Sequence, residues 1–257
     1  MQIRLGAVIP VYNHEHAIGA VLSAVLQHGL RCVLVDDGSD AACAAVLDGL
    51  AAAHPQQVSL LRHSVNRGKG EAVLSGMHFL AQQGFSHALQ IDSDGQHDTA
   101  DIPRFVALAQ EHPKAIINGC PQYDESVPKG RLYARYLTHV WVWINTLSFD
   151  IVDSMCGFRI YPLAVVTALT ARQTLGKRMD FDTEIIVRLH WRGVQVINQR
   201  TRVRYPSDGV SHFRLWLDNV LITRMHATLL CGMLWRSPAL LARKLLRARA
   251  GGQHERQ

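Results

Sequence analysis

The stretch LQIDSDGQHD, Leu89 to Asp98, decides how the chain is organised. Its apolar start ends at Ile91 and turns at once into Asp92 and Asp94, with Asp98 close behind. Carboxylates gathered within a few residues repel one another unless a cation lies among them. The stretch therefore predicts a buried strand that ends in a cation-binding turn.

Similar apolar runs recur on both sides of this stretch. Continuous apolarity is typical of buried parallel strands, and the predicted strands span Ile3–Val11, Cys32–Asp37, Val58–His63, His87–Asp92 and Ala115–Cys120. Helical patterns separate them, over Ala17–His28, Ala41–Ala53, Lys69–Gln83 and Ile102–Glu111. The alternation predicts an α/β fold with a mostly parallel central sheet and helices on both faces.

The alternation stops after Cys120. We predict a helix over Arg131–Phe149, a turn over Asp153–Gly157, a helix over Asp182–Arg192 and a strand over Val194–Arg204. The rest reads as helices, which Arg236 and Pro238 interrupt before any could span a membrane. The expected organisation is one domain over 1–212, amphipathic basic helices over 213–250 and a disordered tail over 251–257.

Composition narrows the class of protein. The 257 residues are 48% apolar and carry a formal net charge of +6, which favours a polyanionic partner such as nucleic acid, an anionic membrane or a phosphorylated substrate. The five cysteines form no CxxC pair, so we expect reduced thiols rather than a disulfide framework. With no signal-peptide pattern at Met1, the expected location is cytoplasmic.

Polar clusters follow four of the predicted strands. They are Pro10–Asn13, Asp36–Ser39, His63–Gly70 and Asp92–Asp98. Ligands of parallel sheets bind where the strands reach their carboxyl ends. We therefore expect the clusters to share one site.

The clusters suggest particular chemistry. Asp92 and Asp94 offer the oxygen ligands that suit Mg²⁺ or Mn²⁺, although Asp and Gly are also ordinary turn residues. Asp37 is placed to bind a base or ribose, while its neighbours Ser39 and Asp40 can simply cap a helix. Neither a P-loop nor a GxGxxG fingerprint is present, which disfavours NTPase and nicotinamide chemistry.

Six motifs together resemble a known family. PVYN, VDDGS, NRGKG, DSDGQH, CGFR and FDTE occur in the order typical of family 2 inverting glycosyltransferases with a GT-A fold, and most resemble the polyprenyl-phosphate sugar transferases such as dolichyl-phosphate mannosyltransferase. The resemblance covers about Ile3 to His212. It implies donor-binding residues Pro10, Tyr12, Asp37, Lys69 and Asp92, and a divalent metal (Mg²⁺ or Mn²⁺) held by Asp92, Asp94 and Gln96.

The acceptor side departs from the family pattern. Relatives that glycosylate a lipid phosphate carry a second arginine further along the acceptor helix, where this chain has Asn145, and a lysine where it has His212. The predicted acceptor-binding residues are Arg131, Arg135, Arg159 and His212. An ionised phosphate needs no base, whereas a hydroxyl does.

Two acidic residues are candidates for that base. Asp182 and Glu184 are the predicted catalytic residues, although acidic residues also simply favour a helix N-terminus. Arg159 is equally compatible with an internal ion pair.

The C-terminal region mixes apolar and basic residues at helical spacing. This pattern predicts helices that lie on an anionic membrane surface, the alternative being a core helix with a solvated tail. No recognised nucleic-acid module is present, so we expect no nucleic-acid partner.

The predicted function is therefore a metal-dependent inverting glycosyltransferase in cell-envelope or lipid glycosylation. It would move a sugar from a UDP- or GDP-linked donor to a lipid-linked or membrane-proximal acceptor, a hydroxyl or a polyprenyl phosphate. We expect it to be peripheral on the inner face of the cytoplasmic membrane. The alternatives are a non-catalytic nucleotide-sugar-binding or membrane scaffold protein and a nucleotidyltransferase.

Overall fold

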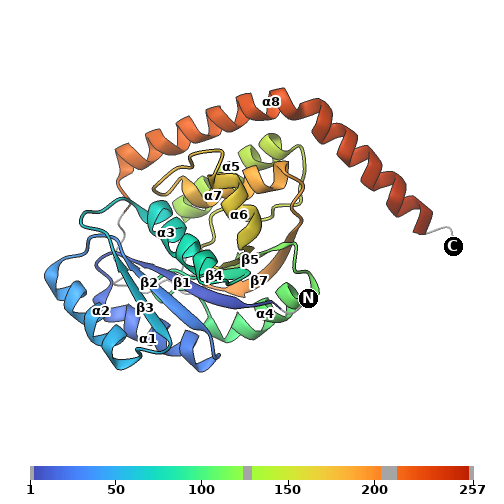
Figure 1. Cartoon of the computed structure of the whole chain (residues 1–257). Coiled ribbons are helices and arrows are strands. Elements are labelled where there is room, and N and C mark those ends of the chain that lie inside the picture. The colour runs from blue at the N-terminus through green and yellow to red at the C-terminus, as the bar shows by residue number, and fades with distance from the viewer. Residues whose placement is uncertain (1–2, 124–128, 204–212, 255–257) are drawn as a thin grey trace.

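A seven-stranded sheet forms the centre of the protein (Figure 1). The computed structural model describes residues 3–123, 129–203 and 213–254. The strands of the sheet are β1 (Leu5–Val11), β2 (Arg31–Asp36), β3 (Val58–Arg62), β4 (His87–Gln90), β5 (Ile116–Gln122), β6 (Arg159–Pro162) and β7 (Val196–Arg202).

The strands lie in the order β3-β2-β1-β4-β6-β5-β7. All neighbours run parallel except β6, which is antiparallel to both β4 and β5. The prediction of a mostly parallel sheet is confirmed. The sequence reading missed β6, because its four residues, RIYP, are too short to show a period.

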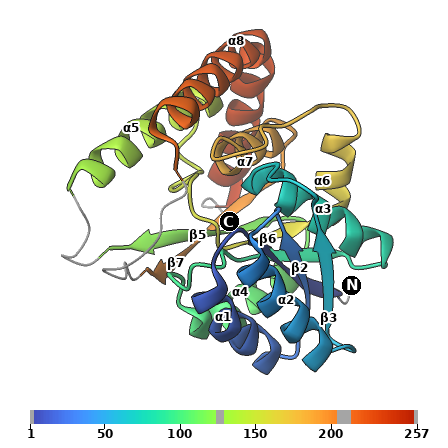
Figure 2. The same cartoon turned by 90° about the vertical axis from the view of Figure 1, so that its left-hand side faces the viewer.

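Helices cover both faces of the sheet (Figure 2). They are α1 (Glu15–Gln27), α2 (Ala41–Ala53), α3 (Lys69–Gln82), α4 (Ile102–Glu111), α5 (Lys129–Thr146), α6 (Leu163–Thr170), α7 (Phe181–Trp191) and α8 (Leu215–His254). Helices α1, α2 and α4 lie below the sheet in Figure 2, and the other helices lie above it.

Each face of the sheet has its own hydrophobic core. In β1, Ala7 and Ile9 pack with the core of α1, α2 and α4, whereas Val8 between them packs with Met77 of α3 on the other face. Successive side chains of a strand point to opposite faces, so a strand covered on both sides must be apolar throughout. The continuous apolar runs of the sequence have this cause.

Helix α8 continues through a proline. Pro238 lies inside it and cannot donate a backbone hydrogen bond to the carbonyl of Leu234. The Ser237 hydroxyl donates to that carbonyl instead, at 2.9 Å. One helix that bends part-way (Figure 1) takes the place of the several helices predicted for this region.

The described helices include none whose length and apolarity would carry it across a bilayer. All five cysteines lie in the described residues and are free thiols. Cys32, Cys43, Cys120 and Cys156 are buried, and Cys231 on α8 is exposed. Burial raises the pKa of Cys32, and raises the pKa of Cys120 and of Cys156 to about 12.

Candidate active site

A lysine joins two carboxylates at the carboxyl edge of the sheet. Lys69, the first residue of α3, places Nζ 2.8 Å from Asp92 Oδ1 and 2.9 Å from Asp92 Oδ2. The same nitrogen lies 2.8 Å from Oδ2 of Asp182, at the start of α7. Three segments far apart in the sequence thus meet at one ammonium group. We call Lys69, Asp92 and Asp182 the Lys69 cluster.

Opposite charges keep Lys69 and Asp92 ionised. Burial alone would lower the pKa of Lys69, but the charges of Asp182 and Asp92 raise it above its ordinary value. Burial alone would raise the pKa of Asp92, whereas Lys69 and His97 hold that pKa below its usual range. His97 Nε2 lies 3.6 Å from Asp92 Oδ2. The Asp92 carboxylate is therefore anionic at neutral pH.

Gly157 of the CGFR motif packs against Asp92. A Cβ at this position would fall far inside 3.0 Å of all three carboxylate atoms, closer than real Cβ atoms approach other atoms. Only glycine leaves room for the carboxylate in this place. This contact gives a physical reason for the glycine in CGFR.

Asp182 is held from beneath by the sheet. Its Oδ1 accepts a hydrogen bond of 2.8 Å from Gln90 Nε2, and its backbone carbonyl accepts one of 2.6 Å from Arg159 Nη1. Arg159, a predicted acceptor-binding residue, is fully buried. Its nearest partners are Asp182 and the hydroxyl of Tyr161, at 3.1 Å.

The predicted metal ligands lie on one turn after β4. Asp94 Oδ1 accepts the backbone N–H of Gln96 at 3.0 Å, and Gly95 between them has a φ of +72°. Within the described residues, no three His, Cys, Asp or Glu side chains converge on one point. Asp92, Asp94 and Gln96 still offer the hard oxygen donors that Mg²⁺ and Mn²⁺ prefer, and substrate phosphates commonly complete such sites. These residues fit a metal shared with a diphosphate.

Asp37, predicted to bind the nucleotide, holds the loop that carries Lys69. Its Oδ1 accepts from His63 Nδ1 at 2.7 Å and from the backbone N–H of Arg67 at 2.9 Å, and its Oδ2 accepts from Gly68 N–H at 2.7 Å. Because the carboxylate is buried and satisfied, it fixes the NRGKG loop to the end of β2.

Pro10 and Tyr12 lie at the end of β1. Pro10 is buried and pairs in register with Val35 of β2, and Tyr12 is half-buried just beyond the strand. Next to them, Asn13 Oδ1 accepts the backbone N–H of Asp40 at 2.9 Å. The loops that follow β1 and β2 are thereby tied together at the edge where the Lys69 cluster lies.

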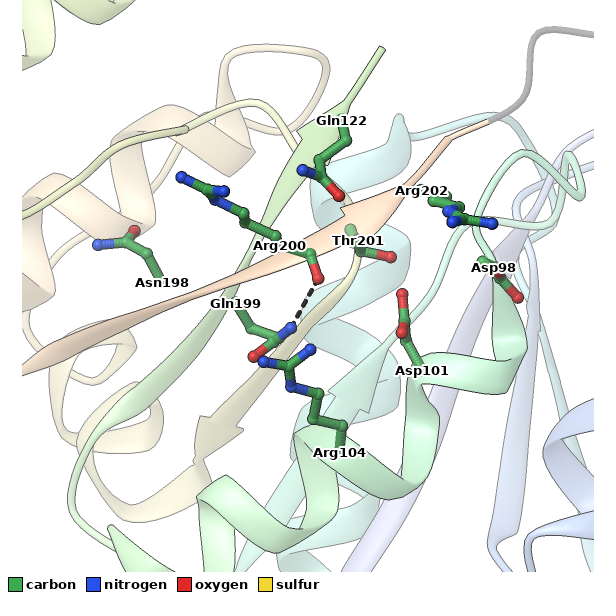
Figure 3. A pocket seen from close by; sticks show the side chains of 9 residues that line it. All are labelled: Asp98, Asp101, Arg104, Gln122, Asn198, Gln199, Arg200, Thr201 and Arg202. Carbon is green, nitrogen blue, oxygen red and sulfur yellow. Dashed lines mark hydrogen bonds between the residues drawn. The ribbon is translucent and has the colours of Figure 1, made fainter. Parts of the chain in front are cut away.

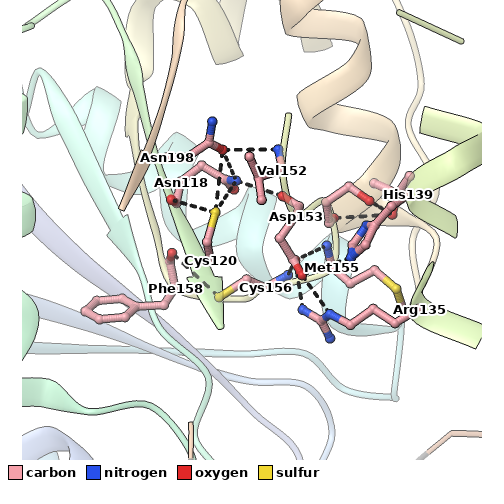
Figure 4. A network of polar contacts seen from close by, with 12 residues as sticks. Asn118, Cys120, Arg135, His139, Val152, Asp153, Met155, Cys156, Phe158 and Asn198 are labelled. Carbon is pink, nitrogen blue, oxygen red and sulfur yellow. Dashed lines mark hydrogen bonds and ion pairs between the residues drawn. The ribbon is translucent and has the colours of Figure 1, made fainter. Parts of the chain in front are cut away.

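Arg135, predicted to bind the acceptor, is paired inside the protein (Figure 4). Its Nε and Nη2 lie 2.7 and 2.8 Å from the two carboxylate oxygens of Asp153, and His139 Nε2 lies 3.3 Å from Oδ2. Burial alone would raise the pKa of Asp153, but His139 and Arg135 lower it below its usual range. Arg131 lies in α5 with its side chain outside the described part, and His212 lies outside the described residues.

Glu184 points away from the Lys69 cluster. Its Oε1 lies 2.8 Å from Nε and 2.6 Å from Nη2 of Arg188, four residues further along α7. Its Oε2 accepts the backbone N–H of Gly176 at 2.5 Å. Of the two predicted catalytic carboxylates, only Asp182 is joined to Lys69 and Asp92.

A polar hollow of about 660 Å³ lies elsewhere, beside β7 (Figure 3). It is lined by Asp98, Asp101, Arg104, Gln122, Asn198, Gln199, Arg200, Thr201 and Arg202. None of Lys69, Asp92 and Asp182 lines it. The residues that line the hollow are therefore different from those of the Lys69 cluster.

Sequence reasoning missed two residues that shape the site. Gln90 lies within the predicted strand His87–Asp92 and Asp153 within the predicted turn Asp153–Gly157, but neither is among the predicted site residues. An uncharged polar residue in the last position of a fully buried strand is the signal that could have drawn attention to Gln90, because a buried amide needs a partner. No such signal marks Asp153.

Comparison with known proteins identifies the family of this chain. The model of "Glycosyl transferase family 2" matches residues 7–166. The chain belongs to glycosyl transferase family 2. It is a glycosyltransferase, and the resemblance read from the six motifs is confirmed.

Two relatives show how far the similarity extends. An uncharacterised protein of Methanocaldococcus jannaschii is 27% identical over 212 residues, which cover 80% of this chain and 90% of the relative. The polyprenol monophosphomannose synthase of Mycolicibacterium smegmatis is 25% identical over 201 residues, 73% of this chain and 71% of the relative. Similarity therefore extends beyond the residues matched by the family model.

Solved structures of glycosyltransferases share the GT-A fold of this chain. Glucosyl-3-phosphoglycerate synthase from Mycobacterium tuberculosis, in complex with phosphoglyceric acid, superposes with a TM-score of 0.61 at 17% identity, covering 91% of this chain and 80% of that one. A mannosyltransferase from Pyrobaculum calidifontis, in complex with GDP-mannose and Mn²⁺, gives 0.57 at 13% identity, covering 97% and 76%. The prediction of a GT-A fold is confirmed.

Proposed function

We propose that the protein is a divalent-metal-dependent, inverting glycosyltransferase that moves a sugar from a nucleotide-diphosphate sugar to a lipid-linked phosphate at a membrane surface. One observation carries the proposal. In a family 2 chain, Lys69 joins Asp92 of the DSDGQH motif to Asp182 of the FDTE motif at the carboxyl edge of the sheet. Donor-side and acceptor-side motifs are thereby adjacent.

The donor side follows from the oxygen ligands. Asp92, Asp94 and Gln96 would hold Mg²⁺ or Mn²⁺, which when bound neutralises charge on the departing diphosphate. Pro10, Tyr12 and Asp37 would border the nucleotide, with Asp37 acting through the loop that it holds. The relationship to a mannosyltransferase solved with GDP-mannose and Mn²⁺ supports this arrangement.

A lipid phosphate is the acceptor that the relatives favour. One relative is named polyprenol monophosphomannose synthase, and another, from Drosophila melanogaster, is named dolichyl-phosphate beta-glucosyltransferase. Such an acceptor arrives ionised and needs no base, and arginines are well suited to bind it. Arg131 and His212 are the proposed phosphate ligands. Arg135 and Arg159 would act indirectly, because their guanidinium groups already bind Asp153 and the Asp182 carbonyl.

A hydroxyl acceptor is the second candidate, and the placement of Asp182 favours it. The carboxylate of Asp182 is in the Lys69 cluster, whereas the carboxylate of Glu184 is bound by Arg188 and Gly176. Asp182 is therefore the better candidate for a base.

Exposed apolar side chains support attachment to a membrane. On α8 they are Leu215, Trp216, Leu217, Val220, Leu234, Trp235, Leu241, Leu245 and Leu246, and on α5 Leu132, Tyr133, Tyr136, Leu137 and Ile144. Trp216 is 84% and Trp235 86% exposed, and tryptophan favours the membrane interface. We propose peripheral attachment to the inner face of the cytoplasmic membrane.

Basic residues of α8 divide between two tasks. Arg243 donates to the carbonyls of His190 and Trp191 at the end of α7, at 3.1 and 3.0 Å. Arg224 is exposed and available to anionic lipid. Charge as well as apolar contact should therefore contribute to membrane binding.

A transfer assay tests the chemistry. UDP- and GDP-sugars are offered with a polyprenyl phosphate or the matching polyprenol, with Mn²⁺ or with EDTA. We expect transfer to the phosphate, its loss in EDTA and its loss in Asp94→Ala, while the exposed control Asp48→Ala keeps activity. Transfer to the polyprenol alone would select the hydroxyl reaction, and EDTA-resistant transfer would refute the metal assignment.

Flotation with vesicles tests the membrane proposal. Trp216→Glu and Trp235→Glu together should reduce binding to anionic vesicles, whereas Val46→Glu on α2, a partly exposed position, should not. Equal flotation of all three proteins would refute the assignment of the surface on α8. Dimerisation in detergent-free solution, lost in the tryptophan variant, would assign that surface to a second copy instead.

A further inference from the structure

Two buried polar side chains lie side by side in the middle of the sheet. Gln90 ends β4 and Arg159 begins β6, and the two residues pair directly across the antiparallel strands. Both side chains are fully buried. Polar groups inside a sheet covered on both faces cost stability unless they are hydrogen-bonded, so their presence points to a specific task.

The hydrogen bonds of both side chains converge on Asp182. Gln90 Nε2 donates to Asp182 Oδ1 at 2.8 Å, and Arg159 Nη1 donates to the Asp182 carbonyl at 2.6 Å. Among the described residues, Gln90 Oε1 and the Nε and Nη2 of Arg159 have no hydrogen-bond partner. The two side chains therefore do not satisfy one another, and Asp182 is the residue that they share.

Gln90 decides which oxygen of Asp182 is left for Lys69. Asp182 is 4% exposed, and its Oδ2 lies 2.8 Å from Lys69 Nζ. An amide nitrogen only donates, so Gln90 Nε2 binds Oδ1 of Asp182 and restricts the rotation of that carboxylate. The Oδ2 that remains meets the lysine that also binds Asp92.

The same strand end thus supplies two parts of the site. Gln90 and Asp92 are two residues apart, so the end of β4 anchors Asp182 through one side chain and contributes a carboxylate through the other. We propose that Gln90 is a positioning residue. It holds the Asp182 carboxylate in the orientation in which Oδ2 contacts Lys69, the lysine that also binds Asp92. The proposal rests on the proposed function, in which Lys69, Asp92 and Asp182 together form the transfer site.

The first experiment replaces the amide with an apolar side chain of similar length. Gln90→Met should lower kcat about tenfold or more, the usual effect of losing one hydrogen bond to a charged group. KM for the nucleotide sugar should stay within about twofold, because the donor ligands are untouched. Gln199→Met is the matched control, since Gln199 is a buried glutamine of β7 whose side chain donates to the Arg200 carbonyl.

A double-mutant cycle separates positioning from a general structural role. If Gln90 acts through Asp182, then Gln90→Met should have no further effect on kcat in an Asp182→Asn background. Additive losses would overturn the positioning role. A fully active Asp182→Asn would instead refute the proposed role of Asp182, so the two failures are distinguishable.

A swapped pair keeps the proposal falsifiable where Gln90→Met does not fold. Gln90→Glu alone sets a carboxylate against the Asp182 carboxylate and removes the hydrogen bond. Gln90→Glu combined with Asp182→Asn restores the bond in the reverse direction with side chains of the same shapes. The swapped protein should melt at a higher temperature than Gln90→Glu alone and remain deficient in transfer. A melting temperature no higher than that of Gln90→Glu would show that this hydrogen bond is not what Gln90 contributes.

Discussion

Gly157→Ala should displace Asp92 while leaving the rest of the fold in place. The added Cβ would overlap the Asp92 carboxylate, which Lys69 holds at 2.8 and 2.9 Å. The backbone can accept the alanine, because Gly157 is not among the residues with positive φ. The strain therefore falls on the carboxylate rather than on the main chain.

The expected loss follows from the overlap. Ordinary contact with a Cβ begins at 3.4 Å, so the carboxylate must retreat by about 1 Å. A displacement of about 1 Å at a reacting centre lowers the rate about 100-fold. Overpacking typically lowers the free energy of unfolding by only about 1–3 kcal/mol. We expect kcat/KM to fall about 100-fold in a protein that is still folded.

Three measurements check this prediction. They are sugar transfer at saturating Mn²⁺, Mn²⁺ titration of transfer, and urea unfolding. The control is Gly49→Ala in α2, where a Cβ meets nothing within 4 Å; it should keep activity and stabilise the protein by about 0.5–1 kcal/mol. A Gly157→Ala protein with kcat/KM within threefold of wild type and unchanged Mn²⁺ dependence would refute the assignment of Asp92.

Four further changes have defined outcomes. In the absence of nucleotide, Lys69→Met should bind Mn²⁺ several-fold more tightly than wild type, because the ammonium group otherwise occupies both oxygens of Asp92. Electron paramagnetic resonance of free Mn²⁺ measures the affinity, and equal or weaker binding would contradict this prediction. Asp153→Asn leaves Arg135 without its buried partner and should lower the free energy of unfolding by about 3–5 kcal/mol, whereas a loss below about 1 kcal/mol would argue against a structural ion pair. Glu184→Gln should lower stability but keep kcat within about threefold, because its carboxylate contacts Arg188 and not Lys69; inactivity in a folded protein would restore it as a candidate base. Burial lowers the pKa of His226 from 6.5 to about 4, so the unfolded state takes up the proton first as pH falls. The free energy of unfolding should therefore drop by about 3 kcal/mol between pH 6.5 and pH 4. His226→Phe should remove that part of the pH dependence.

The sheet was predictable because its strands are apolar on both faces. Runs such as CVLVDD have no alternation to misread, and their polar ends mark the edge at which Lys69 and Asp92 meet. The strand β6 was not predictable, because its four residues depend on pairing with β4 and β5 for their extended form. Such long-range pairing leaves no local pattern.

The partners of the site residues were harder to predict than their positions. The VDDGS motif predicts Asp37, and the acceptor helix predicts Arg135. The contacts of Asp37 with the Arg67–Gly68 backbone and of Arg135 with Asp153, however, depend on how the loops pack. The pairing of Glu184 with Arg188 could have been predicted, since the residues are four apart on one helix. The hydrogen bond that the Ser237 hydroxyl donates to the Leu234 carbonyl, next to Pro238, could not have been predicted.

The placement of the thiols turns α8 into its own reporter. Cys231 is exposed on that helix, whereas the other four cysteines are buried. A maleimide dye should therefore attach at Cys231 in the unmodified protein, without engineered positions, since the other thiols are shielded from the reagent. Quenchers placed at known depths in the lipid would then measure how deeply the helix is immersed.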